Sequence, residues 1–393
     1  MRPHRSTVLI AILLAAVLAA CSSTPRASAP PTPSPSLRGT DEPSPTPPSR
    51  HTDFFRSAVG PILLYQDEET LFAIDAGSTS AEPVPLGASV PPSVEYSPLH
   101  GNGDVMAMPT ADGSVARISR EHGYEPAAFS HRGQVRALAV SPDGRRVALA
   151  TTEDENWMTA DILVTDMRGS WSRLGGLVTS SDGSGGQLNL FWAGRESLVL
   201  IDICHCDGGQ GYASTYRFSI HGGDEELEFL DDEQPFDAGV HLPTGDFAFD
   251  STPPIDCFES EHACDDLPHS LAIAQLNRRT IRTIAERKEI PFNGPRISTD
   301  GRYVAAGSWF MPTLEIYDVR AARRVATRTW PADAVVPAAW VGNRSLVALI
   351  RSNSNGPDEE STTLAMVELR GDDSLQVRPL VERPHITFFG WIR

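Results

Sequence analysis

From about residue 54 to residue 393 the chain alternates short apolar runs with turn residues. The runs are rich in Val, Ile, Leu, Ala and aromatic residues, and Gly, Pro, Asp and Asn separate them. No stretch of ten or more residues shows the 3.6-residue period of a convincing amphipathic helix. Short β-rich runs with regular turn signals are typical of an all-β repeat protein.

Related segments set the phase of the repeat. They are SPDGRRVA (141–148) with STDGRYVA (298–305), WAGRESLV (192–199) with WVGNRSLV (340–347), and the weaker copies SPLHGNGDV (97–105) and LPTGDF (242–247). Ser-Pro-Asp-Gly suits a type I turn, with Ser first, Pro second and Gly fourth. Each segment therefore predicts a tight turn between the first and second strands of a repeat unit.

Each turn segment is followed by a run that we assign to the third strand of its unit. The seven runs are LFAID from Leu71, VARIS from Val115, ILVTD from Ile162, YRFSI from Tyr216, LAIAQL from Leu271, LEIYDV from Leu314 and LAMVEL from Leu364. They recur every 43 to 55 residues or so, roughly the length of a four-stranded propeller blade. The pattern predicts an all-β, seven-bladed β-propeller over residues 54–393.

The first unit lacks a first strand, and the C-terminus supplies a candidate. GPILLYQ from Gly60 and LFAID serve as its second and third strands, and nothing before them matches a first strand. ITFFGWI (386–392) aligns with VVPAAWV (335–341) and QLNLFWA (187–193), tryptophan on tryptophan. We therefore predict that residues 386–392 are the first strand of blade one and close the ring. The recurring Trp192, Trp340 and Trp391 fit packing between blades better than a ligand site.

The S-x-D-G-[R]-x-[VI]-A phrase resembles the WD-like repeats of the TolB propeller domain and its bacterial relatives. The resemblance covers residues from about 55 to 393. It implies a propeller but no particular activity, because such repeats serve as binding platforms and as frames of enzymes. No G-x-S-x-G nucleophile motif occurs, so the similarity to the propeller half of prolyl-oligopeptidase-type enzymes brings no catalytic triad.

The N-terminus has the features of a signal peptide. Arg2 and Arg5 precede the apolar run TVLIAILLAAVLAA, and Leu18-Ala19-Ala20-Cys21 follows. This segment resembles the lipobox of bacterial lipoproteins. The resemblance implies a signal peptide at residues 1–20, cleavage before Cys21 and acylation, such as palmitate, of Cys21. We expect an extracytoplasmic protein anchored in the outer face of the cell membrane or, in a diderm, in the outer membrane.

Residues 21–53 are predicted to be a lipidated, disordered linker. The stretch from Ser22 to Arg50 is rich in Pro, Ser and Thr and has no apolar period. Fully extended at roughly 3.1 Å per residue it reaches up to about 90 Å. The formal net charge of −18 is spread along the chain, which argues against nucleic acid as a partner.

The propeller assignment sorts the connections onto two faces. Turns from first to second and from third to fourth strands lie on one face, the turn face; connections from second to third strands and between units lie on the other, the loop face. Long insertions gather on the loop face, at 151–160, 203–213, 250–269 and 352–362, with 179–187 between units. We take the loop face as the candidate binding face. Its candidate residues are Glu153, Asp154, Glu155, Trp157, Asp207, Asp256, Glu259, Glu261, Asp265, Asp266, Asp358, Glu359 and Glu360.

These acids permit three interpretations. Several oxygen ligands are what calcium requires, although no EF-hand spacing occurs. An acidic rim also steers a basic partner. Solvated surface charge is the simplest interpretation, and tolerated insertions without function remain an alternative for the loops. No metal and no cofactor is predicted.

Four cysteines of the mature chain besides Cys21 lie in two of these loops. Cys204 and Cys206 belong to unit four, and Cys257 and Cys264 to unit five. An even count outside the cytoplasm implies disulfides. We favour pairing across the two blades, since a Cys204–Cys206 bridge closes a small strained ring, with Cys257–Cys264 as the alternative for the second pair. A zinc site that includes His205 and His262 is the competing hypothesis.

The sequence favours a binding function over catalysis. No residue pair has the spacing of a nucleophile with its base, so an enzyme remains uncertain and is the less favoured class. We expect a monomeric propeller that binds an envelope protein or a surface ligand. The alternative is a hydrolase or lyase that acts on a cell-envelope sugar or peptidoglycan fragment at the central channel.

Overall fold

The protein is described here by a computed structural model. It describes residues 51–79, 82–87, 103–131, 133–153, 159–166, 170–178, 187–205, 211–230, 238–241, 243–251, 268–288, 290–308, 311–352 and 361–393. The chain divides into two compact units, Met1–Pro45 and Thr46–Arg393. All described residues belong to the second unit. The predicted signal peptide, Cys21 and most of the linker lie outside them.

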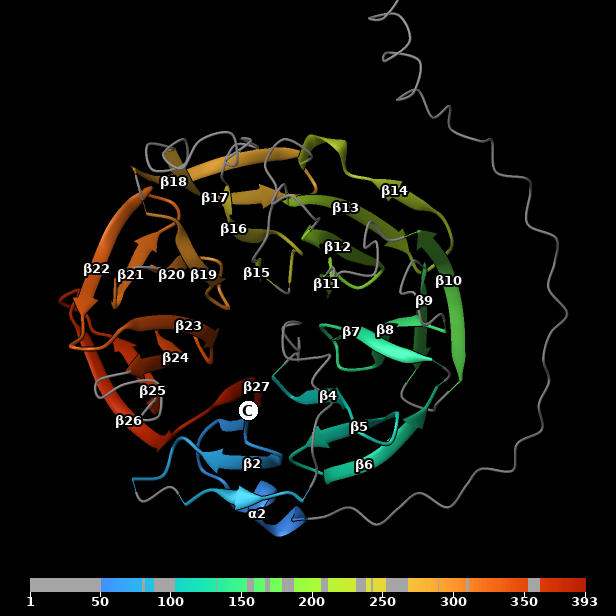
Figure 1. Cartoon of the computed structure of the whole chain (residues 1–393), viewed down its shortest axis with the longest axis horizontal. Helices are drawn as coiled ribbons and strands as arrows, with labels where there is room; N and C mark the ends of the chain where they lie inside the picture. The colour runs from blue at the N-terminus through green and yellow to red at the C-terminus, as the bar shows by residue number, and fades with distance from the viewer. Residues whose placement is uncertain are drawn as a thin grey trace, which may run out of the picture. The chain divides into compact units, whose positions relative to one another are not determined.

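The second unit is a ring of antiparallel sheets around a central axis (Figure 1). Two sheets come from the N-terminal part of the ring and the C-terminal strand. They are β27 (Thr387–Ile392), β1 (Ile62–Asp67), β2 (Thr70–Asp75) and β3 (Val84–Pro85), then β4 (Val105–Pro109), β5 (Ser114–Ser119) and β6 (Gly123–Ser130).

Three further sheets are four-stranded meanders. They are β7 (Gln134–Val140), β8 (Arg146–Thr152), β9 (Thr159–Asp166) and β10 (Trp171–Val178); β11 (Gln187–Trp192), β12 (Ser197–His205), β13 (Gly211–Ser219) and β14 (Asp224–Glu226); and β15 (Gly239–Val240), β16 (Phe247–Ser251), β17 (Pro268–Gln275) and β18 (Thr280–Lys288). A single 3₁₀ turn, η2 (Glu228–Leu230), follows β14.

The last sheet has eight strands. They are β19 (Phe292–Ile297), β20 (Tyr303–Ser308), β21 (Thr313–Asp318), β22 (Arg323–Thr329), β23 (Ala334–Trp340), β24 (Ser345–Ser352), β25 (Ser361–Leu369) and β26 (Leu375–Arg383). Within it β19–β22 and β23–β26 are each a four-stranded meander, and the pair Ser308–Val335 joins them.

The predicted all-β propeller architecture is confirmed, whereas seven separate four-stranded sheets are not observed. Each of the seven predicted third strands lies in a strand: β2, β5, β9, β13, β17, β21 and β25. The described residues, however, form six hydrogen-bonded sheets. The physical reason is local. A Cβ atom on Gly307 would clash with the Val335 carbonyl oxygen, so this glycine lets β20 pair with β23. The β4–β6 sheet has three strands, and residues 88–102 before it are not described.

The predicted closure by the C-terminal strand is confirmed. β27 pairs antiparallel with β1, with Ile62 opposite Ile392 and Leu63 opposite Trp391. The strand begins at Thr387, one residue after the predicted start, and a bulge interrupts the register between Leu64 and Tyr65. In Figure 1 the red β27 accordingly lies beside the blue strands of the first sheet.

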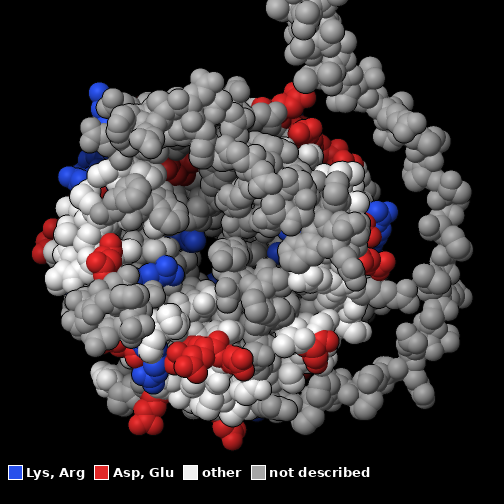
Figure 2. All heavy atoms as spheres, in the orientation of Figure 1, with Lys and Arg blue, Asp and Glu red and all other residues white. Residues whose placement is uncertain are grey.

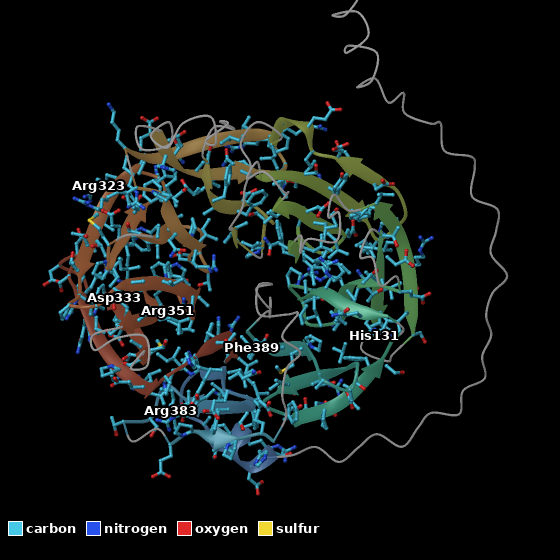
Figure 3. The ribbon with its side chains drawn as sticks, viewed as in Figure 1. His131, Arg323, Asp333, Arg351, Arg383 and Phe389 are labelled. Carbon is cyan, nitrogen blue, oxygen red and sulfur yellow. The ribbon has the colours of Figure 1, made fainter. Side chains whose placement is uncertain are left out.

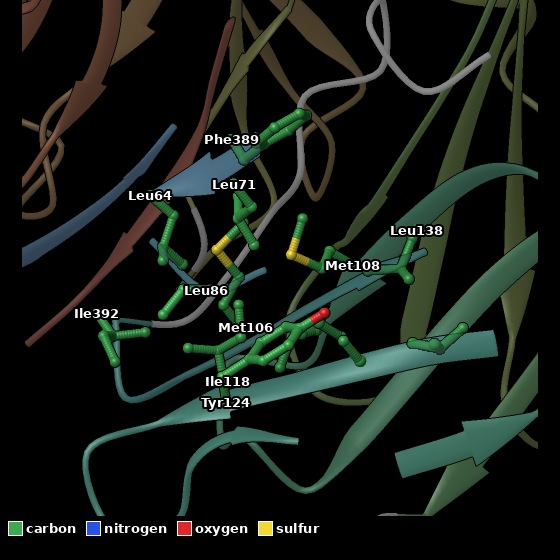
Figure 4. Close-up of a cluster of buried hydrophobic side chains, with 14 of the residues drawn as sticks. Leu64, Leu71, Leu86, Met106, Met108, Ile118, Tyr124, Leu138, Phe389 and Ile392 are labelled. Atoms are coloured by element: carbon green, nitrogen blue, oxygen red, sulfur yellow. The ribbon is translucent and has the colours of Figure 1, made fainter. Parts of the chain in front are cut away.

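Apolar side chains of β27 complete a core shared by neighbouring sheets. Ile392 is fully buried and Phe389 is 5% exposed. Both belong to a cluster with Leu64, Met106 and Ile118, which Figure 4 shows in close-up. The C-terminal residues are therefore core residues, as their apolar character requires.

The Ser-x-Asp-Gly segments form turns held by their own side chains. Ser298 Oγ donates to Asp300 Oδ1 at 2.7 Å, the same carboxylate oxygen accepts from the Arg302 N–H at 3.1 Å, and Gly301 N–H donates to Ser298 O at 2.8 Å. Ser141, Asp143 and Arg145 repeat this arrangement. Gly301 has φ 69°, which only glycine adopts at little cost. The predicted turns between first and second strands are confirmed at both places.

Two of the recurring tryptophans bridge adjacent four-stranded meanders. Trp192 Nε1 donates to Ala139 O at 3.2 Å, and Trp340 Nε1 donates to Arg296 O at 2.8 Å. In each case the donor lies on the first strand of one meander and the acceptor on the first strand of the meander before it. These contacts support the prediction that the tryptophans pack between blades.

A short helix that the sequence did not predict precedes β1. This helix, α2 (Thr52–Ser57), buries Phe55 fully against the first core cluster. Arg56 donates through both Nε and Nη2 to the Glu121 carbonyl oxygen, at 3.2 and 2.8 Å. Within the described ranges, no helix has the length and apolar character needed to cross a membrane.

Candidate functional site

Most of the predicted binding-face residues lie outside the described residues. Glu153 is described: it is exposed and directly follows β8. The others are Asp154, Glu155, Trp157, Asp207, Asp256, Glu259, Glu261, Asp265, Asp266, Asp358, Glu359 and Glu360, and none of them is described. The position of these acids therefore stays a prediction.

The cysteine predictions also remain open. Cys204 lies in β12, where its backbone is in register with Tyr212 on β13. Cys206, Cys257 and Cys264 lie outside the described residues. Neither the disulfide pairing nor the zinc hypothesis is tested by the described part of the chain.

The strands that carry the long insertions are described, and they form a rigid frame. Each insertion joins the second strand of a meander to the third: β8 to β9, β12 to β13, β16 to β17 and β24 to β25. The strand ends remain paired up to the connection, as for Ser251 with Ser270 and Ser352 with Ser361. All four insertions thus begin and end on the same face of the ring, the loop face.

A buried polar cluster lies at the loop-face ends of two neighbouring meanders. Its members are Asp250 on β16, His269 on β17, Arg287 on β18, and Glu315 and Tyr317 on β21. His269 is 8% exposed and Glu315 is 7% exposed. We call this set the polar cluster. The sequence analysis missed it because its members are scattered over 68 residues without a motif, and only the fold brings them together.

Arg287 lies at the centre of the polar cluster. Its guanidinium donates to Glu315 Oε2 at 3.3 Å, to Gly307 O at 3.1 Å and to Pro291 O. Its terminal carbon also lies 3.7 Å from the centroid of the Phe292 ring, a cation–π contact. Burial lowers the pKa of Arg287, and the nearby Glu315 carboxylate opposes that effect. The guanidinium stays charged because arginine does not lose its proton in proteins.

The other members of the polar cluster contact one another within their own meanders, and Asp250 also binds the neighbouring meander through Phe292. Tyr317 Oη donates to Glu315 Oε2 at 2.8 Å, and the Phe292 N–H donates to Asp250 Oδ2 at 3.1 Å. Burial and the Glu315 charge raise the pKa of Tyr317. His269 Nδ1 lies 3.5 Å from Asp250 Oδ2. Even so, burial and the Arg287 charge hold the pKa of His269 below its usual value of 6.5, because both disfavour the charged imidazolium.

Two buried residues of opposite charge interact between neighbouring meanders. Arg136 on β7 is 4% exposed and Asp202 on β12 is 1% exposed. Burial lowers the pKa of Arg136, and the Asp202 charge opposes this shift. On the face drawn in Figure 2, basic side chains lie near the central opening, while the acids among the described residues lie farther out.

One ion pair connects two sheets near the loop face. Arg383 Nε lies 3.2 Å from Asp67 Oδ2, which ties β26 to β1. The backbone N–H of Asp333 donates to the Arg351 carbonyl oxygen at 2.8 Å, which extends the pairing of β23 with β24 within one sheet. Figure 3 labels Asp333, Arg351 and Arg383. Such contacts fix the frame and offer no reactive group.

Among the described residues, no three His, Cys, Asp or Glu side chains come close enough to hold a metal ion. The polar cluster is a structural ion-pair network. Its Glu315 carboxylate accepts hydrogen bonds from Arg287 and Tyr317, and its Asp250 carboxylate accepts one from the Phe292 N–H. The geometry is thus one of a rigid frame carrying long insertions.

Comparison with known proteins supports the fold. No family model matches the chain, and no curated protein matches its sequence. A hypothetical selenium-binding protein from Sulfolobus tokodaii is similar in structure, with a TM-score of 0.52, 11% identity, and coverage of 85% of this chain and 93% of that one. At this identity the similarity shows a β-propeller fold and nothing about function.

Two other solved structures align less well. Hsv2 from Kluyveromyces lactis gives a TM-score of 0.45 at 9% identity and covers 83% of this chain and 99% of its own. The Cps50 (Swd1) β-propeller domain of Myceliophthora thermophila gives 0.44 at 13% identity and covers 72% of this chain and 84% of its own.

Proposed function

We propose that the protein is a lipid-anchored binding platform of the bacterial cell envelope. The observation that carries this proposal is the placement of the long insertions: all four start and end on the loop face of a rigid ring. Propellers bind through loops held by such a scaffold. The partner is an envelope protein or a surface ligand, bound by a monomeric propeller.

The proposal includes a seven-bladed ring. The eight-stranded sheet acts as two blades, because β19–β22 and β23–β26 are complete meanders that share the pair Ser308–Val335. Each blade then contributes one strand to the wall of the channel, and β27 does so for blade one.

The anchor in this proposal is the acylated Cys21. Its support is the signal-peptide pattern and the lipobox-like Leu18-Ala19-Ala20-Cys21. Mass spectrometry of the protein extracted from membranes tests it directly. We expect an N-terminal peptide that begins at Cys21 and carries acyl chains, whereas the Cys21→Ser chain lacks them. An unmodified N-terminus at another residue would exclude the anchor.

The binding role is tested by crosslinking in intact cells followed by affinity capture. The test variant neutralises the acids of the β16–β17 insertion, Asp256, Glu259, Glu261, Asp265 and Asp266, to Asn or Gln. The matched control neutralises five exposed acids of the turn face, Glu121, Glu196, Asp224, Glu226 and Asp373.

We expect the test variant to lose a captured partner that the control retains, because neutralised loops no longer attract a complementary surface. Both variants should melt as the unmodified protein does, since surface charges of this kind contribute little to stability. If neither this variant nor deletion of the four insertions changes the captured set, the loop face is not the binding face.

A further inference from the structure

The turns between first and second strands touch one another on the turn face. Arg146 Nη1 donates to the Arg195 carbonyl oxygen of the next turn at 3.2 Å. A Cβ atom on Gly245 would clash with Ala193 Cα, so the turn after that also approaches its neighbour closely. The turns of three consecutive meanders, β7–β10, β11–β14 and β15–β18, therefore form a continuous arc.

His241 extends this arc to the β19–β22 meander. It heads the turn between β15 and β16, where its N–H donates to the Asp246 carbonyl oxygen at 2.7 Å. Its Nε2 lies 3.2 Å from the Thr299 carbonyl oxygen, and its Nδ1 lies 2.8 Å from Thr244 Oγ1. A Cβ atom on Gly301 would lie 3.3 Å from Nε2, so the imidazole also packs against the neighbouring turn.

The corresponding position in the other turns holds no ionisable side chain. Ser141, Ala193, Ser298 and Val341 head these turns, and each donates its backbone N–H to the first residue of the strand that follows. His241 is therefore the one residue at this position, among the five turns, whose charge can change near neutral pH.

The two ring contacts fix one tautomer of neutral His241. The Thr299 carbonyl oxygen only accepts, so Nε2 carries the hydrogen and Nδ1 accepts from the Thr244 hydroxyl. Thr244 Oγ1 also accepts from the Asp246 N–H at 3.2 Å. A proton on Nδ1 would make it a donor, and the Thr244 hydroxyl would lose the acceptor of its own hydrogen. Protonation is therefore unfavourable while the turns are in contact.

The surroundings of His241 also disfavour its charged form. Burial lowers the pKa of His241, and this effect exceeds the opposing effects of the hydrogen bond to Thr299 and of the Asp246 and Asp300 charges. The other charged side chains of the neighbouring turns are all exposed: Arg195, Glu196, Arg278, Arg279 and Arg302. Solvent and salt screen such exposed charges.

The same two meanders meet at a second histidine on the loop face. His269 belongs to the polar cluster, and burial lowers its pKa as well. Its neighbour Asp250 accepts from the Phe292 N–H of the β19–β22 meander at 3.1 Å. The charged groups of this cluster are Asp250, Arg287 and Glu315. Between the two ends, an apolar cluster shared by both meanders fills the interface.

We propose that the interface between the β15–β18 and β19–β22 meanders is a proton-sensitive seam, whose ends are held closed by neutral His241 on the turn face and neutral His269 on the loop face. A proton binds more readily to an imidazole that has left its buried position, so acid opens the two ends. The contacts are complete above the ordinary histidine pKa of about 6.5 and weaken as the pH falls below it.

The loop-face end of the seam lies at the root of the longest insertion. That insertion joins Ser251 at the end of β16 to Pro268 at the start of β17, next to Asp250 and His269. The seam therefore connects acidity to the frame of the loop face. The inference depends neither on the proposed anchor nor on the proposed partner.

Hydrogen–deuterium exchange at pH 7.5 and pH 5.5, with labelling times adjusted for the intrinsic exchange rate, tests the seam. The chain is the mature protein with Cys21→Ser, which needs no membrane. The reporting segments are the turns 241–246 and 298–302 on the turn face and residues 290–293 on the loop face. The turns 141–145 and 193–196, whose contact involves no histidine, are the internal control.

Three variants accompany the unmodified chain. His241→Gln keeps a donor for the Thr299 carbonyl oxygen and does not titrate, and His269→Gln removes the second titrating ring. The matched control is His122→Gln, since the His122 side chain is exposed in the turn between β5 and β6.

An imidazole with a pKa of about 6.5 in the open seam and a much lower pKa in the closed seam raises the opening constant up to about tenfold between pH 7.5 and pH 5.5. We expect exchange in the three reporting segments to rise by about two- to tenfold, while exchange in the control turns stays the same. His241→Gln should abolish the rise in both reporting turns, and His269→Gln should abolish it in residues 290–293. His122→Gln should behave like the unmodified chain.

Equal exchange at both pH values in any reporting segment would overturn the proposal. An equal rise in the control turns would also overturn it, because acid would then loosen the whole ring and not this seam. Both comparisons use the unmodified chain, so they decide the matter even if a variant fails to fold. A folded His241→Gln chain whose reporting turns keep the full rise would show that other groups sense the proton, and the proposal would be wrong.

Discussion

Replacing Ile392 by alanine tests the closure of the ring at a single side chain. Ile392 lies opposite Ile62 in the β27–β1 pair and is fully buried in the cluster with Leu64 and Met106. Removing a buried isoleucine down to Cβ costs about 2–5 kcal/mol, since the transfer free energy is lost and a cavity remains. With a urea m-value of about 3 kcal/mol/M, the unfolding midpoint should fall by about 0.7–1.7 M.

The assay is equilibrium urea unfolding followed by tryptophan fluorescence and by far-UV circular dichroism. The matched control is Thr387→Ala in the same strand, whose side chain is partly exposed, and its midpoint should change little. A chain that ends at His385 should lose more than Ile392→Ala, because Phe389 and the paired backbone of β27 go as well.

Contacts around the closure explain why the truncation should be severe. Arg120 donates to three carbonyl oxygens, those of Ala58, Gly60 and Arg393, and so joins the entry of the ring to its last residue. Asp75 Oδ1 accepts from the N–H groups of Gly60 and Gly77, each at 2.9 Å. If the truncated chain unfolded at the same urea concentration as the full chain, β27 would not close the ring and the reasoning would be refuted.

Three further predictions concern single residues, and a fourth concerns the cysteines. Asp300→Ala should cost about 1 kcal/mol in urea unfolding, because the bonds from Ser298 and the Arg302 N–H are lost; an equal loss in Asp300→Asn, which keeps one acceptor, would contradict this. Gly239→Ala should cost about 1–3 kcal/mol, since its Cβ would clash with Pro295 O, while Gly342→Ala meets no atom and should be near neutral. Burial holds the pKa of His269 below 6.5, so the unfolded chain binds the proton more readily and the free energy of unfolding should fall as the pH drops below about 6.5. The free energy of unfolding of His269→Gln should fall less steeply between pH 7 and pH 5. An unchanged slope of this free energy against pH would contradict the prediction. Thiol titration of the denatured, unreduced protein should find no free thiol; four free thiols with bound zinc would replace the disulfide prediction by a metal site.

The repeat could be read from the sequence because its signals are local. The Ser-Pro-Asp-Gly turn at Ser141 and its copy at Ser298 depend on residues adjacent in the chain, and the structure shows their bonds. The match of Trp391 to Trp340 was enough to predict a strand pair between residues more than 300 positions apart, such as Ile62 and Ile392.

The features that the sequence could not predict depend on tertiary packing. Helix α2 is six residues long, which is too short for a periodic pattern, and Phe55 is stabilised by a core made from later strands. The polar cluster forms because the ends of β16, β17, β18 and β21 meet, and no spacing along the chain encodes that meeting. The junction of two meanders depends on the missing side chain of Gly307.

The pairing of β1 with β27 has a consequence for biosynthesis. A chain synthesised from its N-terminus presents β1 early, with an open hydrogen-bonding edge, and makes β27 more than 300 residues later. An unpaired edge strand invites aggregation and attack by proteases. A prematurely terminated chain keeps that edge exposed permanently, whereas a finished chain covers it. Pairing with β27 therefore protects the edge of β1 only after the strands between them have been made, so the first strand of the ring is the last to be covered.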